Sequence, residues 1–293
     1  MKYYSLFSLI LLAGLFSGSS LMGQGIEDLV KNRNAGAYEK KITLERKPAP
    51  LPGVREADVT WSKTVWRMID MREKMNQVFY FPTREIQGRN NLVNVLLKGI
   101  KENTITAFVA NPKDDDEFSK PISFEEIKKK IGGGPKTMSI RDLSTGNLRD
   151  STYMQEMSAD DVKKLIVKEI WYFDKQKSSL QVRILGLCPA KVYYRDADAA
   201  KEDPLTVKLF WVYYPEVRTL LAKSESLNAR NGARNLSYDD LFLMRYFDGY
   251  IFQEENVFNN REILDYSKGE YASQESERIK NAIFNYEQDL WEY

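Results

Sequence analysis

Histidine is absent from this chain of 293 residues, and cysteine occurs once, at Cys188. Without histidine the chain cannot form a Ser-His-Asp or Cys-His catalytic centre, and it lacks a common ligand of zinc sites. A single cysteine has no partner for a disulfide within its own chain. Because Cys188 lies among apolar neighbours, we predict that it is a buried, chemically quiet part of the structural core.

The chain is nearly neutral, with 43 basic against 42 acidic residues and a net charge of +1. Proteins that bind nucleic acid or anionic membranes usually carry a basic excess or a basic stripe. Here the basic run 128–130 closely follows two acidic residues, so we expect neither partner. The acidic runs 114–117 and 196–198 lack the alternating ligands and central glycine of a calcium loop. No metal and no cofactor is therefore predicted.

A hydrophobic run long enough to cross a bilayer, roughly 20 residues, is also missing. The apolar stretch from Leu6 to Phe16 is shorter, follows the positive Lys2, and precedes small and polar residues. This layout is typical of a secretory signal peptide, which we predict over residues 1–23. No cysteine stands at the expected cleavage point, so we expect an exported chain without a lipid anchor. Removal of the signal peptide takes away one lysine and leaves 42 basic and 42 acidic residues in the mature chain.

Residues 24–56 show little apolar periodicity, and the stretch 47–53 contains three prolines that favour an extended backbone. We predict an extended, proline-containing arm that lies along its own domain or along a neighbouring subunit. A disordered linker is the alternative. The candidate partner-binding residues are the apolar residues and one arginine of this arm, with a tryptophan at the other end of the chain: Ile42, Leu44, Leu51, Val54, Arg55 and Trp291.

Residues 57–270 are predicted to form the core, which begins with a helix. Apolar side chains at Trp61, Val65 and Met68 recur at helical spacing, and Asp58 is a suitable N-cap. We expect Trp61 and Trp66 to hold this helix to the structural core. Further helices are predicted over 92–100, 123–132, 162–167, 215–222 and 237–246, and short strands over 78–81 and 104–110.

The middle of the chain is rich in β-branched and aromatic residues, which predicts strands. Helices are expected before and after the strands, and a final amphipathic helix is expected within residues 271–293. Hairpin-like strands with flanking helices favour an α+β fold with an antiparallel, strand-rich centre over a parallel βαβ array. The predicted strands are 167–174, 180–187, 192–194 and 205–214, with a hairpin turn at 175–179.

Several blocks of this sequence resemble the GldN/PorN family of Bacteroidetes. Together they cover most of residues 55–293, and their combination is specific. The blocks are Arg55–Lys74, Trp171–Gln176, Arg183–Pro189, Phe210–Glu216, Glu275–Lys280 and Ile283–Trp291.

The resemblance implies a non-enzymatic structural subunit of the type IX protein secretion and gliding motility machinery. Such subunits are expected to assemble with a GldK/PorK-type outer-membrane lipoprotein into a periplasmic ring and to contact the GldM/PorM-type motor protein. The expected location is therefore the periplasm, at the inner face of the outer membrane, through the lipoprotein partner. The family offers no catalytic residues to transfer to this chain.

Two other functions stay open from the residues alone. One is a periplasmic enzyme that acts on glycans through paired Asp and Glu side chains. The other is a carrier of a small ligand, which the aromatic content of 12% would permit. A deep cleft lined by two close carboxylates would favour the enzyme. Size-exclusion chromatography with and without the lipoprotein would separate the assembly subunit from both alternatives.

Overall fold

The structure is a computed structural model that describes residues 45–110, 117–132, 134–141, 148–155, 159–193, 205–227 and 236–290. The predicted signal peptide, residues 24–44 of the predicted arm and Trp291 lie outside these ranges. No helix within the described ranges has both the length and the apolar character needed to cross a membrane.

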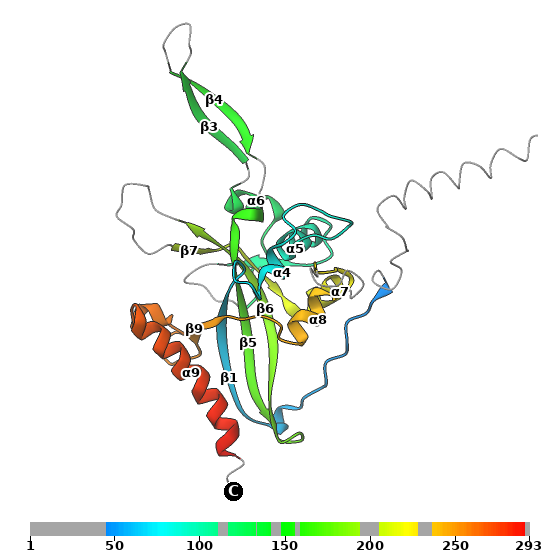
Figure 1. Cartoon of the computed structure of the whole chain (residues 1–293), viewed down its shortest axis with the longest axis vertical. Coiled ribbons are helices and arrows are strands. Elements are labelled where there is room, and N and C mark those ends of the chain that lie inside the picture. Colours follow the sequence, from blue (N-terminus) through cyan, green and yellow to red (C-terminus); the bar gives the residue numbers. More distant parts are fainter. Residues whose placement is uncertain are drawn as a thin grey trace, which may run out of the picture.

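The centre of the molecule is a seven-stranded antiparallel sheet with the order β2-β8-β6-β5-β1-β9, in which β7 also pairs with β6 (Figure 1). A separate hairpin of β3 and β4 projects beyond α6. The strands of the large sheet are β1 Val59–Asp70, β2 Ala107–Val109, β5 Val162–Asp174, β6 Ser179–Tyr193, β7 Leu205–Lys208, β8 Phe210–Tyr213 and β9 Tyr250–Glu254; the hairpin is β3 Gly134–Arg141 and β4 Leu148–Gln155.

Helices flank the sheet, so the prediction of an α+β fold with an antiparallel, strand-rich centre is confirmed. The helices of the described ranges are α4 Gln77–Tyr80, α5 Leu92–Lys101, α6 Phe124–Ile131, α7 Tyr214–Lys223, α8 Tyr238–Leu243 and α9 Glu270–Asp289. The short 3-10 turns are η2 Glu56–Asp58, η3 Ala159–Asp161 and η4 Ile263–Asp265.

The predicted helix that begins near Asp58 is wrong, because residues 59–70 form strand β1. This strand pairs with β5 over its whole length, and both of its faces are covered in its second half. Val65 and Trp66 point to opposite faces and are both buried. Because both faces of the strand carry apolar residues, these residues also occur at helical spacing. Pairing with β5 decides the conformation in spite of that spacing.

Two further local predictions are wrong. The strand predicted over 78–81 is not formed, because Gln77–Tyr80 form the short helix α4. The helix predicted over 162–167 is not formed either, because these residues begin β5 directly after η3. Leu165, Ile166 and Val167 are all fully buried, so this run enters a sheet that is covered on both faces.

The ends of α6 and α8 are set by the capping residues that the sequence contains at those positions. The Ser123 side chain accepts a hydrogen bond from the Glu126 amide, and Gly132 ends α6 with a left-handed backbone at φ 109°. The Ser237 hydroxyl accepts from the Asp240 amide, while the Asp240 carboxylate accepts from the Ser237 amide, which is a complete capping box at α8. These side chains satisfy backbone donors that the first turn leaves unpaired.

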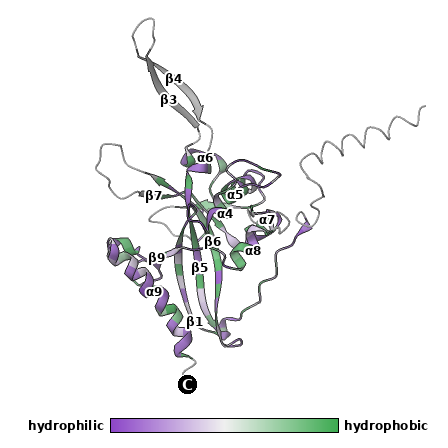
Figure 2. Ribbon diagram, viewed as in Figure 1, coloured by the Kyte–Doolittle hydropathy of each residue, from purple (hydrophilic) through white to green (hydrophobic). Residues whose placement is uncertain are grey.

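One face of the sheet carries two apolar clusters. Helices α4, α5, α7 and α8 pack over the larger cluster, which includes Leu165, Phe210 and Phe242. Helix α9 packs over the smaller one, where Ile279 and Ile283 meet β1 and β9. Figure 2 shows the corresponding mixture of hydrophilic and hydrophobic residues along α9. The amphipathic helix is thus an integral layer over this end of the sheet.

The opposite face carries a compact aromatic cluster that includes Trp66, Cys188 and Trp211. Phe118 lies on this cluster, with its ring centroid 6.1 Å from that of Trp211. A Cβ atom at Gly186 would lie 2.5 Å from the Phe118 ring, so a larger residue would collide with it. The absence of a side chain at Gly186 therefore lets the segment containing Phe118 pack on the sheet.

Candidate protein-interaction surface

The described part of the arm lies along its own domain and is attached through polar contacts. Side chains from three elements, α8, α7 and β6, hold it in turn. Asp240 forms an ion pair with Arg46 at 2.8 Å, Arg218 donates to the Ala49 carbonyl at 2.6 Å, and Arg183 donates to the Pro52 carbonyl. Residues 46–52 therefore pass over the β6 side of the sheet before the chain enters β1.

The predicted partner-binding residues of the arm fall into two groups. Ile42 and Leu44, like Trp291 at the other end, lie outside the described residues. Leu51 is 37% exposed and Val54 is half-buried. The Arg55 side chain is exposed and pairs with Asp58 at 2.9 Å. The arm therefore presents apolar groups to solvent although it contacts its own domain.

The tryptophans predicted to be core residues occupy different environments. Trp66 is buried, and the Lys168 ammonium lies 5.3 Å from the centroid of its ring. Trp61 is half-buried and stacks on Tyr286 of α9 with ring centroids 4.5 Å apart. Trp66 is thus a core residue on one face of the sheet, whereas Trp61 is a half-buried contact between β1 and α9.

Sequence reasoning missed an exposed cluster in the connection between β9 and α9. The Arg261 guanidinium lies 4.6 Å from the ring centroid of Phe258 and 4.6 Å from that of Tyr266. We call these three residues the aromatic–arginine cluster. Phe258 is 62% exposed and Tyr266 is 40% exposed. Tyrosine and arginine are residue types that recur at the energetic centres of protein interfaces.

The connection holds this cluster in place through hydrogen bonds rather than through a large core. The Asn256 side chain accepts from the Phe258 amide at 3.0 Å, and the Asn260 side chain accepts from the Asn256 amide at 3.0 Å. Ile263 of η4 is buried and fixes the turn to the sheet. A preorganised loop loses less conformational entropy when it binds a partner.

The electrostatics beside the cluster link it to α9. The Tyr266 hydroxyl donates to Glu275 at 3.2 Å, and Arg278 donates to the same carboxylate at 2.7 Å. The hydrogen bond from Arg278 is the main reason that the pKa of Glu275 lies below its usual value. Desolvation, followed by the charge of Glu275, raises the pKa of Tyr266. At neutral pH the cluster therefore presents a neutral phenol and a cation.

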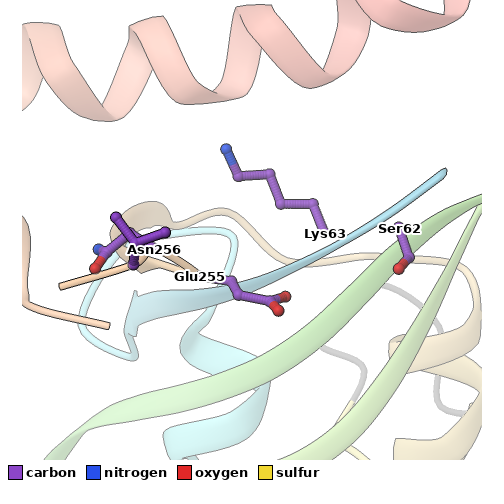
Figure 3. A pocket seen from close by; sticks show the side chains of 5 residues that line it. Ser62, Lys63, Glu255 and Asn256 are labelled. Atoms are coloured by element: carbon purple, nitrogen blue, oxygen red, sulfur yellow. The ribbon is translucent and has the colours of Figure 1, made fainter. Parts of the chain in front are cut away.

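Two cavities are found near β1 and β9. The larger one, about 380 Å³, is an open groove lined by Ser62, Lys63, Glu255, Asn256 and Val257 (Figure 3). The smaller one measures about 190 Å³ and includes Glu73, Asp248 and Glu277 in a mostly polar lining. Small-ligand pockets usually span roughly 300–1,000 Å³ with a predominantly apolar lining. The larger cavity is within this size range, but it is an open groove with one carboxylate, Glu255, in its lining. The smaller cavity has three carboxylates but is below the size range, so neither is the deep cleft expected of a glycan-acting enzyme.

Cys188 is fully buried, and burial raises the pKa of its thiol to about 12. Such a thiol stays protonated and is a poor nucleophile. Across the described ranges, no group of three or more His, Cys, Asp or Glu side chains is arranged to hold a metal ion.

The comparisons with known proteins identify the family of this chain. No match is found among the curated proteins. The family described as "Gliding motility associated protein GldN" matches residues 54–292, a range that includes every strand and helix described above. The chain belongs to the GldN family.

Proposed function

We propose that this protein is a non-enzymatic structural subunit of the type IX protein secretion and gliding motility machinery. In this proposal it assembles with a GldK/PorK-type lipoprotein into a periplasmic ring and contacts the GldM/PorM-type motor protein. The lipoprotein holds it at the inner face of the outer membrane. Membership of the GldN family supports the association with gliding motility and secretion.

The structural feature that best supports a role in assembly is the aromatic–arginine cluster. Phe258, Arg261 and Tyr266 offer rigid apolar area and a cation at the surface, and the connection that bears them is tied down by hydrogen bonds. When aromatic and arginine side chains of this kind become buried against a partner, they supply most of the binding free energy in many protein interfaces. The predicted export signal at residues 1–23 supports the periplasmic location.

Co-purification with the lipoprotein tests this proposal. The mature chain and a soluble form of the GldK/PorK-type lipoprotein, mixed and separated by size-exclusion chromatography, should elute together. Arg261→Ala should weaken binding about tenfold or more, which is roughly 1.4 kcal/mol. Phe284→Ala, at an exposed aromatic residue on α9, is the matched control and should bind as the parent does. Separate elution of the two parent proteins would overturn the proposal.

A further inference from the structure

One edge of strand β1 is open over the first half of the strand. β5 pairs with β1 from Val59 to Asp70, but on the other side β9 pairs with it only from Val65 to Met68. The last backbone bond on that side joins the Glu255 amide to the Thr64 carbonyl at 2.9 Å. Among the described strands, none continues this pairing toward Val59.

The open edge presents backbone groups that can pair with another strand. Along a strand, the backbone groups of alternate residues point to the same side. Because the Thr64 carbonyl points toward β9, the amide and carbonyl of Ser62 point to the open side. Ser62 is exposed and lines the groove of about 380 Å³. An unpaired edge of this kind is a template for strand addition.

The surroundings of the edge suit an extended peptide. Figure 3 shows the groove between β1 and the chain that leaves β9, with Lys63 and Glu255 on its walls. Val257 is 92% exposed at the same groove, and Glu255 is exposed. One oxygen of the Glu255 carboxylate accepts from the Thr64 amide at 3.0 Å. A strand with both apolar and basic side chains would contact Val257 and pair with the other oxygen of Glu255.

Residues 38–44 of the arm have this character. Their sequence is Tyr-Glu-Lys-Lys-Ile-Thr-Leu, in which the apolar residues Tyr38, Ile42 and Leu44 occupy even positions and Lys40 stands between the first two. In a strand, these four side chains would share one face, which would therefore be mainly apolar with one cation. Lys40 on that face is complementary to the carboxylate of Glu255.

We propose that residues 38–44 of one copy add as a strand to the open edge of β1 in a second copy. Arg46 is held by Asp240 of α8, and Arg183 of β6 holds Pro52, so the arm leaves its own domain on the β6 side. The open edge faces the other way, beyond β5 and β1, next to α9 (Figure 1). A neighbouring copy is therefore better placed to supply the strand.

This inference rests on the proposed role as an assembly subunit, and a complementation experiment with the full mature chain tests it. Ser62→Pro removes the outward amide of the edge, and Ser62→Ala is the control that keeps it. Ile42→Pro disrupts the donor segment, with Ile42→Val as its control. The parent and both controls should self-associate in light scattering, whereas each proline variant should be monomeric. An equimolar mixture of the proline variants should form dimers, because one supplies an intact edge and the other an intact arm.

A peptide of residues 36–46 gives an independent readout if Ser62→Pro does not fold. It should inhibit self-association of the parent chain, and a peptide with Ile42→Pro should be at least tenfold weaker. Self-association of the Ile42→Pro variant at the parent level, no effect of the peptide, or monomeric mixtures of folded proline variants would each overturn the inference. Lipoprotein binding by the monomeric variants is measured in parallel, so that a failed strand exchange is distinguishable from a failed proposed function.

Discussion

Glu169 is a carboxylate with no solvent exposure, placed in the middle of the sheet between two arginines. Arg245 donates to both of its oxygens at 3.0 and 3.1 Å, Trp171 donates at 3.1 Å, and the Arg67 Nε atom lies 3.6 Å away. Removing one partner of a buried ionic group leaves the other charge without compensation. This cluster therefore fixes how β1, β5 and the segment after α8 meet.

The change Glu169→Leu should lower the free energy of unfolding by about 3–5 kcal/mol, because Arg67 and Arg245 would stay largely buried without their counter-ion. Urea denaturation measures the loss. Glu277→Ala is the control, since its ion pair with Lys280 is exposed and should contribute less than about 1 kcal/mol. If the Glu169→Leu variant were as stable as the parent, the cluster would not be a source of stability.

At Cys188, we expect a maleimide reagent at pH 7 to leave the native protein unmodified over hours. The thiol is fully buried and its pKa is raised to about 12, so the reactive thiolate is both rare and inaccessible. Unfolding in urea should allow stoichiometric labelling within minutes. Rapid modification of the folded chain would contradict the described position of Cys188.

What the sequence reveals about single residues depends on how local their environment is. Cys188 sits in a short apolar run, so its burial can be predicted from its neighbours. The environment of Glu169 cannot, because Arg67 and Arg245 come from distant parts of the chain. The aromatic–arginine cluster is local in the sequence, but it depends on the irregular turn around η4, which no periodic pattern predicts. This turn places the ring centroids of Phe258 and Tyr266 each 4.6 Å from the Arg261 guanidinium.

At the scale of elements, capping residues can be predicted well and sheet pairing cannot. Ser123, Gly132 and Ser237 act within one helical turn, so a few neighbouring residues specify their roles. Strand β1 depends on pairing with β5, which lies about a hundred residues later in the chain. Burial on both faces removes the alternation that would identify such a strand.

The packing of Phe118 on Gly186 gives a test at this scale. Gly186→Ala should destabilise the protein by about 1–3 kcal/mol, because the new Cβ would lie 2.5 Å from the Phe118 ring. Phe118→Ala removes that ring, so Gly186→Ala should cost much less in the Phe118→Ala background. Urea denaturation of the four proteins completes the cycle. Equal costs in both backgrounds would show that the two residues are not in contact.

At the scale of the whole molecule, the arm and the core should behave as separable parts. The described contacts of the arm are a partly exposed ion pair with Asp240, a donation from the partly exposed Arg183 and a donation from the buried Arg218. The two partly exposed contacts contribute about 0–1 kcal/mol each. We therefore expect residues 24–52 to contribute little to the stability of the core.

Deletion of residues 24–52 should shift the melting temperature by only a few degrees and should sharply reduce self-association or lipoprotein binding. The reason is that the deletion removes Ile42, Leu44 and Leu51 but leaves all strands and helices from β1 onward. Limited proteolysis should cut the arm first in the free protein and spare it in the complex. Unfolding of the deletion variant would show that the core needs the arm, and unchanged self-association would place the interface between copies on the folded core.

The most direct test of the central claim, that this chain is an assembly subunit, is crosslinking of periplasm under mild conditions followed by mass spectrometry of the recovered chain. We predict crosslinks to a GldK/PorK-type lipoprotein and to further copies of the chain, concentrated in the arm and in the connection between β9 and α9. Recovery of the chain without any protein partner, with all crosslinks internal to one copy, would contradict the account.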